Sequence, residues 1–377
     1  MKTYFKILLV LIINYFGNIN DLISGDLHQI YLKGQVNLSK KLVIPDSSQK
    51  EKIFFSQPTS VDADSNGNIY VMDSRDYNIK KFDSKGKYII SFGRKGQGPG
   101  EFAGLCRMRI NNKNIYTYDL VNRRLSIFTL EGKLKDTYTI PYPIFDFRID
   151  KLGNITMETR EFNYKSTGSD LMSIILFNNS FKLIDTVFSK LVSINKYLFS
   201  PQFMNIPIPF PFQVCWDVNS KGNIIIGFSE KYKAYIYDLY NKEIKTLLSH
   251  NTPPVKVTRQ DEENFFNSIG YISSKGEIDN KNDQLNFIKR NVKFPNNKPF
   301  FQSLIVDAED NTLILLYEPP ENGWYFYDVF NSEGKFINRV KLPLFLGELF
   351  RFKGRHIYGI EQDKEGFPIV VIYSLER

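Results

Sequence analysis

Charged residues recur at one position of a repeated strand pattern, and they are the first candidates for chemistry. When six strand-like segments are aligned on the turns that follow them, this position holds Asp62, Arg109, Arg148, Asp217, Asp307 and Arg351. The signs predict three pairs between neighbouring repeats: Asp62 with Arg109, Arg148 with Asp217, and Asp307 with Arg351. A buried charge is tolerated when it is paired, so we expect structural ion pairs. The alternative is a polar channel that binds a small charged ligand or ion.

A second set of candidates is basic and aromatic and lies in loops between the predicted strands. Its members are Arg75, Tyr77, Arg94, Lys95, Arg123, Arg124, Arg160, Lys231 and Trp324. Guanidinium groups suit carboxylates and phosphates, so together they predict a binding face for an anionic ligand or an acidic protein. For any single arginine, a solvated surface is the simpler interpretation.

Residues for catalysis are scarce. His28, His250 and His356 are too scattered to predict a metal cluster. The chain has no serine nucleophile motif, phosphate-binding loop or dinucleotide fingerprint. Cys106 and Cys215 fall in different repeats, so we expect no disulfide. We predict no catalytic residue, no metal and no cofactor.

The stretch from Gln57 to Phe102 shows the element that must position these candidates. Four short segments alternate or are β-branched, and turns rich in Asp, Asn and Gly separate them. A glycine-rich exit, Gly93 to Gly100, follows the fourth segment. Four antiparallel strands in about forty residues is the size of one propeller blade.

This stretch resembles an NHL repeat over VDADSNGNIYVMDSRDYNIKKFDSKGKYIISFGRKGQGPGEF, residues 61–102. The exit GRKGQGPGEF is similar to the blade junction of bacterial six-bladed β-propeller proteins. The resemblance implies a fold and not an activity. NHL-like propellers that act as lyases use histidine-bound metal, and no corresponding histidines occur here.

Further repeats predict an all-β, six-bladed propeller of four-stranded antiparallel blades. Their first strands are expected near residues 106–111, 145–149, 214–218, 301–307 and 349–353. The last repeat has only three strands, and His28 to Lys33 alternates well enough to supply the fourth and close the ring. Two insertions interrupt the period, 190–211 and 253–299, and a sequence like a capping box at Thr258 predicts a short helix over 258–269.

Composition and the first residues bear on location. The 377 residues are 42% hydrophobic with 32 Phe and 22 Tyr, enough for a large β-rich core, and the net charge of +8 is spread along the chain. Lys2 and Lys6 precede a short apolar run, so residues 1–24 are expected to be a signal peptide and 25–377 the propeller. An apolar N-terminal strand is the alternative. We expect an exported protein, periplasmic or extracellular, with no transmembrane span after signal removal.

Three functions fit these features. The first is a non-enzymatic scaffold, monomeric, that recognises a protein, peptide or glycan through its basic loop face. The second is an enzyme acting on a carbohydrate or small anionic substrate at the channel mouth, which a cluster of carboxylates with shifted pKa values in a pocket there would favour. The third, nucleic-acid binding, fits a basic face but not export, so we expect no nucleic-acid partner.

Overall fold

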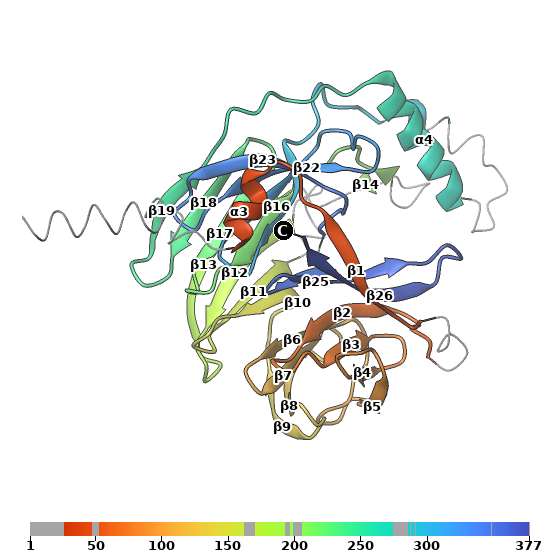
Figure 1. Cartoon of the computed structure of the whole chain (residues 1–377), viewed down its shortest axis with the longest axis vertical. Coiled ribbons are helices and arrows are strands. Elements are labelled where there is room, and N and C mark those ends of the chain that lie inside the picture. Colours follow the sequence, from red (N-terminus) through yellow and green to blue (C-terminus); the bar gives the residue numbers. More distant parts are fainter. Residues whose placement is uncertain are drawn as a thin grey trace, which may run out of the picture.

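The protein is a six-bladed propeller of four-stranded antiparallel sheets, as predicted (Figure 1). The computed structural model describes residues 26–46, 53–161, 170–192, 197–198, 206–273, 286, 288–290, 292–347 and 349–376. The expected signal peptide, residues 1–24, lies outside the described residues.

Five sheets follow the chain, each running in order from its first strand to its fourth. The first two are β2 (Pro58–Ala63), β3 (Ile69–Asp73), β4 (Asn78–Phe82), β5 (Tyr88–Phe92) and β6 (Cys106–Asn111), β7 (Asn114–Asp119), β8 (Arg124–Thr129), β9 (Leu134–Thr139). The third and fourth are β10 (Ile144–Ile149), β11 (Ile155–Glu161), β12 (Asp170–Phe177), β13 (Leu183–Val192) and β16 (Val214–Val218), β17 (Ile224–Phe228), β18 (Lys233–Asp238), β19 (Glu243–Leu248). The fifth is β20 (Phe301–Val306), β21 (Thr312–Leu316), β22 (Tyr325–Phe330), β23 (Phe336–Leu342).

The sixth sheet joins the two ends of the described chain. Its order is β24 (Phe350–Lys353), β25 (His356–Gln362), β26 (Pro368–Leu375) and β1 (Leu38–Ile44). An N-terminal strand closes the ring, as expected, but the strand predicted at His28 to Lys33 was wrong. Residues 28–32 belong to helix α3 (Asp26–Leu32), which buries Leu27, Ile30 and Tyr31. These three buried residues are three and then one residue apart, which is a helical spacing. This helical period outweighs the weak alternation of the segment.

Apolar cores lie between neighbouring sheets, because each blade has two faces to bury. The described residues form six large clusters, and each combines side chains of two adjacent blades. The first strands contact one another around the centre, and β24 contacts β2. Helix α3 lies in the cluster between the fifth and sixth blades. Burial therefore stabilises the ring as a whole and not one sheet at a time.

The turns after four first strands share one hydrogen-bond pattern. In each turn, a side-chain oxygen of one residue accepts hydrogen bonds from the backbone amides two and four residues later. The accepting residues are Asp64, Asp150, Asn219 and Asp307. Asp307 is thus a turn residue, and its place in the predicted row of channel charges was wrong. The equivalent channel position in β20 belongs to Ile305, which pairs with Leu313 as Asp62 pairs with Tyr70.

Helix α4 (Arg259–Ser273) lies at the opposite end of the molecule from β5 in Figure 1. The predicted capping box is confirmed. The Thr258 amide donates to the Asp261 carboxylate at 2.9 Å, and the Asp261 amide donates to the Thr258 hydroxyl at 3.2 Å. A short hairpin of β14 (Tyr197–Leu198) and β15 (Ile206–Pro207) lies in the other insertion.

Asp307 predicts a pH dependence of stability. Its carboxylate accepts a hydrogen bond from the buried Tyr31 hydroxyl at 2.9 Å, yet burial raises its pKa to about 6. The native state then binds a proton that the unfolded chain, with a carboxyl pKa of about 3.9, does not. The free energy of unfolding should therefore fall by about 2–3 kcal/mol relative to Asp307→Asn as the pH rises from about 4 to about 6. Asn219 shows that asparagine serves in this turn.

Denaturant titrations of both proteins across this pH range measure the difference. Parallel stability curves would contradict the raised pKa.

Candidate functional site

Two cavities open at the ends of the central channel. The first, here the loop-side cavity, has a volume of about 350 Å³ and lies where first strands begin, among the blade junctions. The second, the turn-side cavity, has about 320 Å³ and lies among the turns that follow those strands. Arg148, Ile305 and Arg351 line both. The two cavities are thus separated by a layer of side chains from the first strands.

Asp146 of β10 is the shared acceptor of the charges between the cavities. Its carboxylate forms ion pairs with Arg109, with Arg148 at 2.7 Å and with Arg351 at 3.5 Å. Burial alone would raise its pKa, but the three guanidinium charges outweigh burial and hold the pKa far below the usual range. Asp146 therefore stays ionised and neutralises part of a buried positive cluster.

One of the three predicted pairs is confirmed. Arg148 donates from Nε to Asp217 at 2.5 Å. Within the described residues Asp62 makes no salt bridge with Arg109; it accepts from the Ile110 amide at 2.8 Å and pairs with Lys353 at 3.1 Å.

The predicted pair of Asp307 and Arg351 was also wrong. In the part of the chain that the structure describes no salt bridge joins them, because Asp307 lies in the turn after β20. Arg351 turns instead to Asp146. Sequence spacing placed five of the six charges on first strands, but it could not say which oxygen each arginine would reach.

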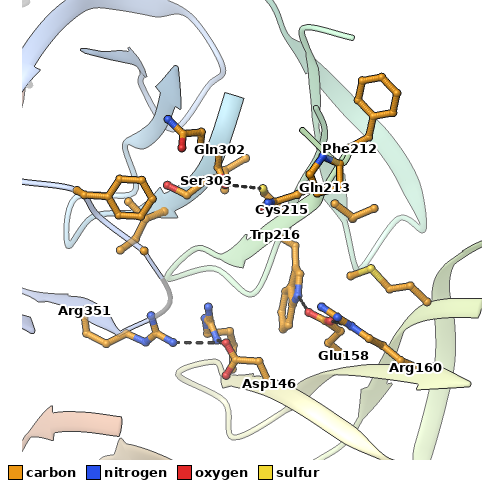
Figure 2. A pocket seen from close by; sticks show the side chains of 18 residues that line it. Asp146, Glu158, Arg160, Phe212, Gln213, Cys215, Trp216, Gln302, Ser303 and Arg351 are labelled. Carbon is orange, nitrogen blue, oxygen red and sulfur yellow. Dashed lines mark hydrogen bonds and ion pairs between the residues drawn. The ribbon is translucent and has the colours of Figure 1, made fainter. Parts of the chain in front are cut away.

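Glu158 of β11 lies directly opposite Asp146 of β10 in the strand register. It is 6% exposed, and its carboxylate accepts from Trp216 Nε1 at 2.8 Å and from Arg160 Nε at 2.6 Å. Burial raises its pKa, and the charge of Arg160 only partly offsets this. Figure 2 shows Trp216 and Glu158 side by side in the cavity. Two neighbouring carboxyl groups thus have pKa values shifted in opposite directions.

Aromatic and amide side chains surround these charged side chains, which form the floor of the loop-side cavity. Phe212 and Phe345 line the cavity and remain 51% and 40% exposed. Gln213, Gln302 and Ser303 add polar groups to the walls (Figure 2). Exposed rings beside amides and a fixed charged floor are suited to a ligand that has both a flat apolar face and hydrogen-bonding groups.

One residue of the predicted loop face lines the loop-side cavity. Arg160, near the end of β11, lines it, whereas the other eight candidates lie outside its lining, seven in loops and blade junctions and Arg124 at the start of β8. Arg160 and Arg123 both line a neighbouring hollow of about 560 Å³. Arg75, Lys231 and Trp324 are placed in loops between second and third strands.

Several loop arginines also have partners within the chain. Arg94 pairs with Glu101 at 2.7 Å. Arg124 donates to the carbonyl oxygen of Gly98 at 2.6 Å. Lys95 lies over the ring of Tyr77 at 5.3 Å. These side chains fasten the glycine-rich junction as well as presenting charge.

Sequence reasoning missed Asp146, Glu158 and Trp216. A signal was present, because Asp146 with Arg148 and Glu158 with Arg160 are opposite charges two residues apart, on one face of a strand. The described residues contain no group of three or more metal-binding side chains. Cys106 and Cys215 are not joined in a disulfide.

Comparison with known families agrees with this geometry. A family model described as 6-bladed beta-propeller matches residues 50–261, more than half of the chain. The chain belongs to this family. No curated protein matches the propeller.

Some solved structures are similar to this chain at low identity. A Bacteroides fragilis protein designated as exported has a TM-score of 0.52 with this propeller at 14% identity, over 94% of this chain and 98% of that one. Virginiamycin B lyase from Staphylococcus aureus has a TM-score of 0.44 at 9% identity, over 91% of this chain and 100% of the lyase. Among the described residues, no helix is both long enough and apolar enough to cross a membrane.

Asp146 should be the most sensitive charge of the site. Asp146→Asn keeps the shape but leaves Arg109, Arg148 and Arg351 without their shared carboxylate. An uncompensated buried charge costs about 3–5 kcal/mol, so the free energy of unfolding should fall by that amount. Urea titration measures the change, and the matched control is Asp136→Asn on the exposed strand β9. Restoration of part of the loss by adding Arg351→Gln would confirm the cause, and a stable single variant would contradict it.

Proposed function

We propose that this propeller is an exported binding protein whose ligand, a protein, peptide or glycan, is held in the loop-side cavity. The observation that supports this most is the pair of exposed rings, Phe212 and Phe345, beside a charged floor that is already fixed. A soluble surface rarely leaves aromatic rings open around a polar hollow without a ligand or partner. The basic loops with Arg75, Arg94 and Arg123 would extend the contact to a larger partner.

The charged groups of the cavity favour binding over catalysis. The Asp146 carboxylate is committed to three arginines, and both oxygens of Glu158 accept hydrogen bonds from neighbouring side chains. A general base or nucleophile needs a lone pair that can reach a substrate. Fixed carboxylates of this kind instead hold the shape of the pocket, and the arginines that pair with them offer their remaining N–H donors to a ligand.

Export, repeat type and assembly are part of the proposal. The charged and apolar start of the sequence supports a signal peptide over residues 1–24, and a structural relative from Bacteroides fragilis is designated as exported. The likeness of residues 61–102 to an NHL repeat supports that repeat type. We propose a monomer that does not bind nucleic acid, since an exported protein rarely meets it.

A second candidate function rests on the carboxyl pair. Asp146 and Glu158 are opposite each other on β10 and β11, and their environments shift their pKa values in opposite directions. Such a difference is how enzymes separate an acid from a charged neighbour. Glu158 would donate a proton to a carbohydrate or small anionic substrate, while ionised Asp146 would stabilise positive charge.

Ligand binding should depend on the exposed rings of Phe212 and Phe345 in the loop-side cavity. We expect the double variant Phe212→Ala, Phe345→Ala to lose at least about tenfold in affinity, because exposed rings over a pocket are typical hot spots. Its free energy of unfolding should change by less than about 1 kcal/mol, since both rings are partly solvated. A glycan array and a peptide library identify the ligand, and titration calorimetry measures its affinity.

The matched control is Tyr240→Ala, a ring 73% exposed after β18, at a turn outside the loop-side cavity. Equal affinity of the double variant and wild type would place the ligand elsewhere. Loss only in an Arg75→Glu, Arg123→Glu variant would move the site to the loop face.

The enzyme alternative predicts a different result at Glu158. Glu158→Gln should lower turnover by about 10²–10⁴-fold while changing substrate affinity little, as for loss of a general acid. Because burial raises the pKa of Glu158, wild-type turnover should fall as the pH rises through that pKa. Hydrolysis of a panel of chromogenic glycosides and small anionic esters provides the assay. Glu161→Gln, on the exposed end of the same strand, is the control; equal turnover by Glu158→Gln and wild type rules out this role.

A further inference from the structure

The channel contains two arginines with an unused buried donor. Arg109 is 7% exposed, and its Nε makes no hydrogen bond to any described residue; the same is true of the buried Nε of Arg351. Both side chains line the turn-side cavity. Buried N–H groups are nearly always satisfied, because an unpaired one costs the full desolvation free energy.

The other guanidinium nitrogens already have partners. Arg109 donates from Nη1 to the Met108 carbonyl oxygen at 2.7 Å and from Nη2 to Asp146. Arg351 donates from Nη1 to the Phe350 carbonyl oxygen at 2.6 Å, and its Nη2 lies 3.5 Å from Asp146. These bonds hold both guanidinium groups in place while the Nε donors stay unpaired.

Burial and neighbouring arginines lower the pKa values of both side chains. Burial lowers the pKa of Arg109 far below its usual range, and the nearby charge of Arg351 lowers it more than Asp146 raises it. Burial and the charge of Arg148 lower the pKa of Arg351 to about 10. Neighbouring guanidinium groups therefore disfavour the positive charge of both side chains.

Five aspartates line the turn-side cavity, but none of them accepts a hydrogen bond from either Nε in the described part of the chain. Asp62 accepts from the Ile110 amide and pairs with Lys353. Asp217 accepts from Arg148 and from the Val306 amide at 2.9 Å. The unpaired groups are donors, so a ligand that completes the site must accept hydrogen bonds, and two guanidinium groups favour an acceptor that carries negative charge.

We propose that the channel binds a small anion, a halide or a small carboxylate, between Arg109 and Arg351. The anion enters through the turn-side cavity of about 320 Å³, which Lys151 and Lys353 also line. This site is distinct from the loop-side cavity, because Arg109 does not line that cavity, although Arg351 lines both.

Chloride is the first probe, and chlorine-35 NMR is the measurement. A chloride ion held in a protein site relaxes faster than free chloride, so the wild-type protein should broaden the signal in a saturable way. Arg351→Gln should bind chloride about tenfold more weakly, because one charge-assisted hydrogen bond is lost. This variant is expected to fold, since Asp146 still forms ion pairs with Arg109 and Arg148.

Arg259→Gln is the matched control. It makes the same change of charge at a helix side chain that is 91% exposed. Saturable broadening by wild type and Arg259→Gln, reduced in Arg351→Gln, supports the site. Equal broadening by all three proteins, or none by wild type, overturns it, and the wild-type titration decides alone should Arg351→Gln not fold.

Competition distinguishes the two kinds of anion. Sodium acetate is added at constant chloride and constant ionic strength, so that screening does not change. Loss of the excess broadening assigns the site to carboxylates as well as halides. Persistence of the broadening assigns it to halides, and both results keep an anion between the two arginines.

Discussion

A propeller blade is apolar on both faces, so every sheet must be covered twice. The six apolar clusters of the described residues meet this requirement, since each lies between two adjacent blades. An open row of blades would leave two faces in water, and only a closed ring removes both. The N-terminal segment completes the closure twice: β1 adds the fourth strand of the sixth sheet, and α3 fills the cluster beside it.

Closure also explains why charge collects in the centre. The first strands converge there, and their side chains face one another across a narrow channel instead of an apolar neighbour. Charges at these positions are tolerable only when they are shared, and Asp146 shares one carboxylate among Arg109, Arg148 and Arg351. Asp62 and Asp217 also accept amide hydrogen bonds from the next first strand, which fixes the register of neighbouring blades.

Much of the fold could be predicted from local signals, because turns and strand alternation are written in adjacent residues. The six blades and the cap of α4 follow from such signals. Two errors arose where one residue type serves two roles. Asp307 is an aspartate of a turn and resembled an aspartate of the channel, and residues 28–33 contain apolar positions compatible with either period. The candidate site was harder to predict. Glu158 and Trp216 are brought together by packing of the third blade against the fourth, and no short stretch of sequence encodes that packing.

The two cavities are linked by the residues between them. Arg351 lines both, and it contacts the carboxylate of Asp146, whose strand neighbour Glu158 lies in the loop-side cavity. A negative charge beside Arg351 on the turn side would draw its guanidinium group from Asp146, and Asp146 would then depend more on Arg109 and Arg148. Any ligand that contacts Arg351 from the loop side must affect that balance in turn, because linkage between two sites is reciprocal. The layer of charged side chains therefore both stabilises the ring and physically connects its two openings.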